Sequence, residues 1–377
     1  MKFKHHLLTL MAIAAAQLLP AQNNANEAPV PPHNIVQLAL LLDVSGSMDG
    51  LIEQAKSELW TIVNEVAKAK KQGQHTRLEI ALYEYGRTSN PAENGYIVKL
   101  LDYTSDLDTI SEVLFSLRTN GGDEYCGQVI AKSLEELQWR DSDSIYRVIF
   151  IAGNEPFNQG RKDYQESCEQ ARSKGIFVNT IHCGDSLTGV RQFWQHGAQI
   201  GNGGYFFINH NSKQYDIPTP YDSMMGVYND SLNSTYWSFG NMGLVKKMNQ
   251  SKQDNNAGTM SKSVKAKRAV SKTKAVYDNK KWDAVDAAKH DTSFARTTRE
   301  EALPEQLKGK TPEARKQALD SAARKRAEFS KKINELNLLR EQYIAANKPA
   351  APAEKTLGAA LVEAIHRQAG LKGFVFE

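Results

Sequence analysis

The sequence has few cysteines, little excess charge and no long apolar run after its first residues. Three of its 377 residues are cysteine, at positions 126, 168 and 183, and their spacing matches no zinc-binding pattern. A formal net charge of +4 is too small for a general nucleic-acid binder. No later segment is apolar enough to cross a bilayer. We therefore expect neither a zinc-cysteine domain, nor a nucleic-acid binder, nor a membrane-spanning protein.

The first 21 residues have the form of a signal peptide. Lys2 and Lys4 precede the apolar stretch LLTLMAIAAAQLL, and PAQ offers a cleavage site after Ala21. The stretch is short and rich in alanine for a membrane span, and polar residues follow it directly. We predict an exported protein, periplasmic or secreted, without a membrane anchor of its own. An uncleaved N-terminal helix is the alternative.

From residue 35 onward, predicted strands and helices alternate. The strand candidates are apolar runs at residues 35–42, 77–85, 96–101, 146–152, 176–182 and 205–208. The helix candidates are residues 51–72, 106–117, 127–139, 160–175, 190–201 and 220–232. Several strands are apolar throughout, as expected for strands that are covered on both faces. The pattern predicts an α/β domain with a doubly wound, mostly parallel sheet over roughly residues 33–235.

Export would permit one disulfide bond, with one thiol left over. Cys168 falls early in the helix before strand 176–182, and so near the edge of the sheet where Cys183 ends that strand. Cys126 begins another helix close by. We expect a Cys168–Cys183 bond, with Cys126–Cys183 as the alternative.

The composition changes after residue 235. Residues 249–274 are polar, basic and poor in large apolar side chains, which predicts a flexible linker; a basic patch for an anionic surface is the alternative. Residues 274–288 carry enough aromatic and apolar side chains to dock on another surface. We assign residues 236–300 as a linker and docking segment, and residues 301–377 as a helical C-terminal region.

One long amphipathic helix is predicted over residues 311–346. Thr311 is a suitable N-cap, and Pro312 suits the first helical position. Apolar residues recur every three or four positions, but Arg326 and Arg340 fall on the same stripe and argue against a strict coiled coil. We expect this helix to pack on the α/β domain or on a helix at residues 357–369; a partner helix is the alternative.

The first apolar strand ends in the sequence LLLDVSGSM, which places Asp43, Ser45 and Ser47 at alternate positions. In doubly wound sheets, ligands bind at the carboxyl ends of the strands, where Asp43 is expected. One carboxylate and two hydroxyls are hard oxygen donors that suit Mg²⁺, and less specifically Mn²⁺ or Ca²⁺. Because the hydroxyls are neutral, the cation stays electron-poor and attracts a further anion. The motif predicts a metal-bridged recognition site that needs no catalysis.

The stretch LLLDVSGSM, with the strand before it and the helix after it, resembles the first metal-binding loop of the von Willebrand factor A domain. The resemblance covers about residues 35–235. It implies a doubly wound sheet with a metal-ion-dependent adhesion site at its top. The sequences AGNEPF and NTIHCG also resemble a secreted bacterial subgroup of this family.

The resemblance implies a second ligand loop in the sequence TNGGDEYCG. Asp123 follows the glycine pair where the family has a threonine, so Asp123 is predicted as the metal ligand from this loop. Thr119 and Glu124 are the alternatives nearby. Alternatively, this segment is only the start of a helix, where the negative charges of Asp123 and Glu124 would interact favourably with the positive end of the helix dipole.

The third loop of the chain, IFIAGNEPF, departs from the family pattern T-D-G. Ala152, Gly153 and Asn154 occupy these positions, so a glycine stands in place of the usual aspartate. Asn154 and Glu155 are possible substitutes at a shifted spacing. A cation held by the first two loops and by water remains feasible.

These observations predict an exported, non-enzymatic recognition protein. A divalent cation held by Asp43, Ser45, Ser47 and Asp123 would bind an acidic side chain of a partner protein. The first alternative is a scaffold protein with the same fold and no metal. The second is a metal-dependent hydrolase, for which Glu155 would have to act as the general base.

Overall fold

The computed structural model describes residues 34–209, 217–347 and 356–377. The predicted signal peptide, residues 1–21, lies outside these ranges. Within them, none of the helices combines the length and the apolar character that a membrane span requires.

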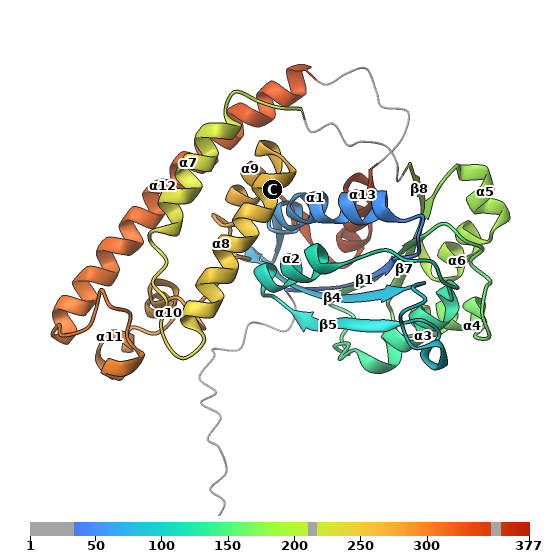
Figure 1. Cartoon of the computed structure of the whole chain (residues 1–377), viewed down its shortest axis with the longest axis horizontal. Helices are drawn as coiled ribbons and strands as arrows, with labels where there is room; N and C mark the ends of the chain where they lie inside the picture. The colour runs from blue at the N-terminus through green and yellow to red at the C-terminus, as the bar shows by residue number, and fades with distance from the viewer. Residues whose placement is uncertain (1–33, 210–216, 348–355) are drawn as a thin grey trace, which may run out of the picture. The chain divides into compact units, whose positions relative to one another are not determined.

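A six-stranded sheet forms the centre of the α/β part (Figure 1). Its order is β5-β4-β1-β6-β7-β8, and all neighbouring strands run parallel except β4 and β5. The strands are β1 (Ile35–Asp43), β4 (Arg77–Tyr85), β5 (Val98–Thr104), β6 (Tyr146–Gly153), β7 (Phe177–Cys183) and β8 (Asn202–Ile208). Each lies within a few residues of a predicted strand, and the doubly wound, mostly parallel sheet is confirmed.

Helices cover both faces of this sheet. They are α1 (Asp49–Val66), α2 (Leu107–Ser116), α3 (Cys126–Glu136), α4 (Tyr164–Ser173), α5 (Ser186–Arg191) and α6 (Trp194–Ile200), with a short 3-10 turn at Ala92–Asn94. Side chains alternate between the faces of β1, so Leu38 and Leu40 join the core under α1, whereas Ala39 and Leu41 join the core under α3 and α4. Double coverage explains why every residue of β1 is buried.

The sheet separates the three cysteines. Cys183 lies in the core on the α1 face, whereas Cys126 and Cys168 lie in the core on the opposite face. All three are buried free thiols. Both predicted disulfide bonds are therefore wrong, because proximity to one edge of a sheet does not place two side chains on the same face.

The end of the chain returns to the α/β part. Helix α13 (Leu357–Leu371) packs on α1 and on β6, β7 and β8. Its buried Gln368 accepts a hydrogen bond from the Tyr146 hydroxyl at 2.8 Å and donates one to Asn179 at 2.7 Å. Strand β9 (Val375–Phe376) then pairs with β2 (Ala69–Lys71), which also pairs with β3 (Gln74–His75). Residues 357–377 thus complete the α/β part.

The flexible linker predicted for residues 249–274 is wrong. The chain there forms α8 (Gly243–Met260) and α9 (Lys262–Ser271). Basic residues of these helices make ion pairs with acids elsewhere in the chain: Lys246–Asp106 at 2.6 Å, Lys252–Glu112 at 3.1 Å and Lys265–Asp230 at 3.1 Å. The basic residues therefore attach these helices to other parts of the same chain. Composition alone does not distinguish such a segment from a linker.

A buried charge cluster joins α9 to α2 and α8. The Arg268 guanidinium is fully buried and pairs with Asp108 at 2.8 Å and with Asp254 at 2.5 Å. Lys272 pairs with Asp254 at 3.0 Å. The ring of Trp60 lies 4.6 Å from the guanidinium. These neighbours compensate a charge that burial alone would make very costly.

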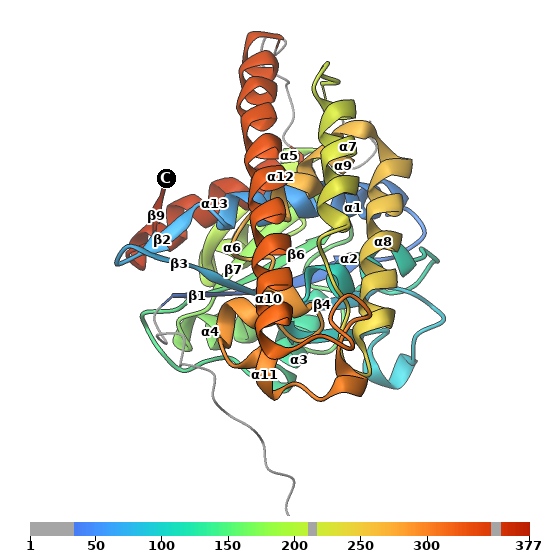
Figure 2. The ribbon, with the colours of Figure 1, turned by 90° about the vertical axis from the view of Figure 1, so that its left-hand side faces the viewer.

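Helix α12 (Pro312–Asn347) confirms the long helix and packs inside its own chain. Its neighbours are α7 (Asp222–Asn233), α9, α10 (Ala284–His290) and α11 (Phe294–Thr297), with a 3-10 turn at Glu300–Ala302 before it (Figure 2). The two arginines of its stripe make buried contacts: Arg326–Asp283 at 2.7 Å and Arg340–Asp222 at 2.9 Å. The expected contact with the predicted α/β domain is made through α7.

We predict that Arg268→Met destabilises the protein by about 3–5 kcal/mol, because Asp108 and Asp254 lose the cation that compensates their burial. Lys252→Met is the matched control: it breaks an exposed pair with Glu112 and should cost less than about 1 kcal/mol. Urea unfolding followed by circular dichroism measures both. Equal losses for the two variants would contradict this role of the buried cluster.

Candidate metal site

The D-x-S-x-S loop lies at the carboxyl edge of the sheet, as predicted. Asp43 is the last residue of β1 and is fully buried. Its Oδ1 accepts a hydrogen bond from the Ser45 backbone N–H at 2.7 Å. The hydroxyl oxygens of Ser45 and Ser47 are 3.5 Å apart. The structure thus brings together the three residues that the motif singles out.

In the second loop, Glu124 lies beside Asp43, whereas Asp123, the residue that the sequence predicted as the metal ligand, points away from it. The Asn120 backbone N–H donates to the Val44 carbonyl at 3.0 Å, which holds the second loop against the first. Glu124 is buried, and its side chain lies beside those of Asp43 and Ser45: a Cβ atom on Gly86 would lie 2.8 Å from Glu124 Cγ, 2.9 Å from Asp43 Oδ1 and 3.6 Å from Ser45 Cβ. Asp123 is exposed and accepts a hydrogen bond from the Tyr125 hydroxyl at 3.1 Å.

Backbone packing explains which acid turns inward. A Cβ atom on Gly122 would lie 2.6 Å from the carbonyl oxygen of Gly86, so only glycine allows the two backbones to approach this closely. This contact fixes the course of the loop immediately before Asp123 and Glu124. Asp123 and Glu124 are adjacent in sequence and both follow the glycine pair. The sequence therefore offered no reason to choose Glu124 beyond its position next to Asp123.

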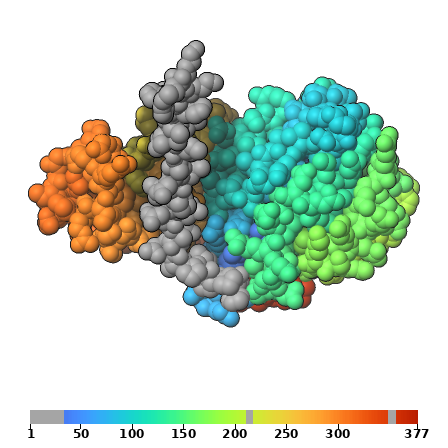
Figure 3. Space-filling view, turned by 90° about the horizontal axis from the view of Figure 1, so that it is seen from below, coloured from blue at the N-terminus to red at the C-terminus, as the bar shows by residue number. Residues whose placement is uncertain are grey.

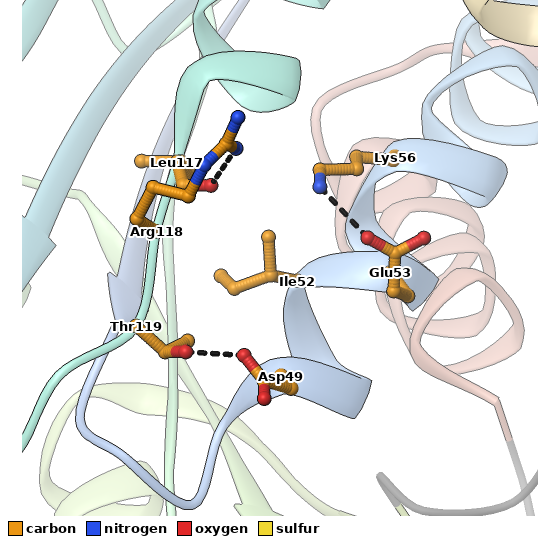
Figure 4. Close-up of a pocket in the computed structure, with 7 residues that line it drawn as sticks. All are labelled: Asp49, Ile52, Glu53, Lys56, Leu117, Arg118 and Thr119. Atoms are coloured by element: carbon orange, nitrogen blue, oxygen red, sulfur yellow. Dashed lines mark hydrogen bonds and ion pairs between the residues drawn. The ribbon is translucent and has the colours of Figure 1, made fainter.

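Thr119, the other alternative, belongs to a separate pocket beside the site. Its hydroxyl donates to the Asp49 carboxylate, and this pair forms one wall of a pocket of about 330 Å³ (Figure 4). On another side, Lys56 pairs with Glu53 at 2.7 Å. The remaining lining residues are Ile52, Leu117 and Arg118. The structure therefore engages Thr119 with α1 and not with Asp43.

The third loop has a physical reason to carry glycine. A Cβ atom on Gly153 would lie 2.6 Å from the Tyr85 hydroxyl oxygen and 3.1 Å from Asp43 Oδ2, so an aspartate at this position would displace both neighbours. Asn154 donates from Nδ2 to the Ser47 hydroxyl at 3.2 Å. The partly buried Glu155 lies near enough for its charge to act on both Asp43 and Glu124. Asn154 and Glu155, the two possible substitutes for the missing aspartate, therefore both lie near the D-x-S-x-S loop.

The two buried carboxyl groups perturb each other. Burial is the main reason that the pKa of Asp43 is raised to about 6, and the charge of Glu155 adds to the effect. Burial and then the charge of Asp43 raise the pKa of Glu124 to about 10. Without a cation, the pair therefore retains a proton at neutral pH.

The donor set fits a hard divalent cation. Asp43 Oδ2 is buried and has no hydrogen-bond partner among the described residues. The four converging side chains offer only oxygen donors, from two carboxyl groups and two hydroxyls, which suits Mg²⁺, Mn²⁺ or Ca²⁺. In the described part of the chain, no cluster of three or more His, Cys, Asp or Glu is placed to hold a metal. The candidate site differs from such a cluster because two of its four oxygen donors are serine hydroxyls.

We predict that the metal-free protein loses stability as the pH rises. The folded-state pKa of both Asp43 and Glu124 lies above the unfolded value, so folding retains protons that the unfolded chain releases. The free energy of unfolding is therefore highest below the pKa of an unperturbed carboxyl group. It falls as the pH rises toward about 6, the pKa of Asp43, and then toward about 10, the pKa of Glu124. The slope is about 1.4 kcal/mol per pH unit for each proton that the folded state retains.

Thermal unfolding in a chelator from pH 5 to pH 9 measures this loss. Glu124→Gln should reduce the loss, whereas Asp123→Asn, which changes an exposed neighbour, should leave it unchanged. Parallel curves for wild type and Glu124→Gln would contradict the pairing of the two carboxyl groups.

The chain is similar to known domains over its first half. Residues 34–217, just under half of the chain, match a family model described as "Protein of unknown function (DUF1194)". No curated protein matches the chain. The strand order and the D-x-S-x-S loop at the carboxyl edge confirm the predicted resemblance to the von Willebrand factor A fold.

Solved structures are also similar to part of this chain, three of which follow. BatB from Bacteroides thetaiotaomicron is 16% identical, with 46% of this chain and 90% of that chain covered and a TM-score of 0.36. The SpRpn10 VWA domain is 16% identical, with 46% and 87% covered and a TM-score of 0.36. Proximal thread matrix protein 1 from the mussel byssus, with a zinc-occupied MIDAS motif, is 15% identical, with 46% and 42% covered and a TM-score of 0.35.

Proposed function

We propose that the protein is a non-enzymatic binding module that recognises an acidic group of a partner protein through a divalent cation. The observation that carries this proposal is that the buried side chains of Asp43 and Glu124 lie side by side, next to the hydroxyls of Ser45 and Ser47. Two buried acids in contact are costly unless a proton or a cation compensates them. A divalent cation would compensate both charges at once.

Coordination chemistry supports a role in recognition. Mg²⁺ takes about six oxygen ligands in near-octahedral geometry and usually keeps some positions for water or for a bound partner. Asp43, Ser45, Ser47 and Glu124 would supply fewer than that, and Ser47 lies on the exposed side of the loop. A partner carboxylate could therefore replace water at an open position. Mn²⁺ and Ca²⁺ accept the same donors.

The location of the protein is part of the proposal. The basic and apolar character of residues 1–21 supports export to the periplasm or beyond. There, a recognition module would meet partner proteins of the envelope or of the surroundings.

A hydrolytic function has a single candidate base. A metal-dependent hydrolase needs a general base that activates water beside the cation. The Glu155 carboxylate lies near the site but accepts a hydrogen bond from Gln159 at 3.3 Å. Loss of a measured turnover in Glu155→Gln, with cation binding retained, is the result that would favour a hydrolase.

We predict that isothermal titration with Mn²⁺ detects binding by the wild-type protein and none by Asp43→Ala. Glu124→Gln should weaken Mn²⁺ binding at least about tenfold, because the cation loses a charged ligand. Even mutations of residues that only hydrogen-bond to a metal ligand typically lower metal affinity by about 10–100-fold. Asp123→Asn is the matched control and should bind like wild type.

The other outcomes separate the alternatives. Weakened Mn²⁺ binding by Asp123→Asn, with normal binding by Glu124→Gln, would show that Asp123 is the metal ligand, as the sequence predicted. No heat with wild-type protein would favour the metal-free scaffold.

A further inference from the structure

We propose that the partner presents large apolar side chains next to its acidic group, and that these pack on an exposed apolar face at α5. This inference rests on the proposed function and deepens it, because it states the chemistry of the partner segment. We call the surface formed by Leu187, Val190 and Phe193 the α5 face.

The three side chains are unusually exposed for their size. Leu187 is 70% exposed, Val190 40% and Phe193 41%. Leu187 and Val190 are three positions apart on a helix and so share one side of it. Phe193 follows at the turn into α6. Exposed apolar residues that lie close together in this way mark an interaction site more often than a scattered single residue does.

The α5 face borders the candidate metal site. Strands β6 and β7 are parallel neighbours, so α5, which follows β7, starts at the same edge of the sheet as the third loop (Figure 1). Two hydrogen bonds join that loop to the turn after α5: the Phe157 N–H donates to the Gln192 carbonyl at 2.9 Å, and Trp194 Nε1 donates to the Glu155 carbonyl at 2.8 Å. Glu155 in turn lies near Asp43 and Glu124.

The turn after α5 holds Phe193 in a strained backbone conformation. Phe193 has φ +68°, which a residue with a side chain rarely adopts. Its ring centroid is 6.1 Å from that of Tyr164, yet much of the ring stays exposed. Strain of this kind tends to collect at binding sites.

The rim of the α5 face is polar, and its charged groups are already engaged. Asp185 accepts a hydrogen bond from the Thr188 backbone N–H at 2.9 Å, and Arg191 donates to the Thr188 hydroxyl at 2.8 Å. An apolar centre inside a polar rim is the usual anatomy of a protein interface. Figure 3 shows the molecule from below, with the green surface of the α/β part at the end away from the orange helices. The metal selects the acid, and the α5 face selects its apolar neighbours.

Labelled short peptides test this inference on the full-length protein with Mg²⁺ present, by fluorescence anisotropy. One peptide set has leucine and phenylalanine on either side of a single aspartate, and the other has glycine and serine there. We expect the apolar set to bind wild type about tenfold more tightly, a difference of about 1.4 kcal/mol. Replacing aspartate by asparagine should abolish binding of both sets.

The double variant Leu187→Ser/Val190→Ser should remove the tenfold difference and leave Mn²⁺ affinity unchanged. The matched control is Leu371→Ser/Val375→Ser, two exposed apolar residues near β9, which pairs with β2 away from the D-x-S-x-S loop. This control should retain the difference.

The outcomes separate the two proposals. Equal affinity of both peptide sets for wild type, or a difference that survives in the α5 variant, would overturn the inference while the cation-dependent function stands. Absence of Mg²⁺-dependent binding by either set would overturn the proposed function and the inference with it.

Discussion

Two carboxyl groups from separate loops meet at the carboxyl edge of the sheet, and the interpretation of the site depends on that contact. Asp43 ends one of the two central strands, and Glu124 reaches it from the loop before α3. Glycines permit the approach: a Cβ atom on Gly86 would lie 2.8 Å from the Glu124 side chain and 2.9 Å from Asp43 Oδ1. The fold thus tolerates two acids that repel each other when both are ionised, which is expected where a cation is to be held.

The sequence was informative where one local pattern determines the structure. Apolar runs located the six strands of the main sheet, and several of these runs are continuous because central strands are covered on both faces. The D-x-S-x-S motif located Asp43 because a strand end fixes its position. The choice between Asp123 and Glu124 depends on how Gly122 packs against another loop, and no local pattern records that contact.

The same reasoning explains the errors farther along the chain. Residues 249–274 have the composition of a linker, but Lys252 and Arg268 in this segment pair with acids that lie more than a hundred residues earlier in the sequence. The pairing of Cys183 failed because the sheet separates it from Cys126 and Cys168. In both cases the decisive contact is distant in sequence. Helices α8 to α12 therefore form ordered structure whose buried arginines dock them on the rest of the chain.

Anomalous diffraction from crystals of the protein soaked in manganese would show whether the two carboxyl groups hold a cation. We predict a manganese peak bound by the carboxylates of Asp43 and Glu124 together with the hydroxyls of Ser45 and Ser47, with Asp123 turned away from it. A structure with no peak at this edge, and the two carboxyl groups still in contact, would contradict the account.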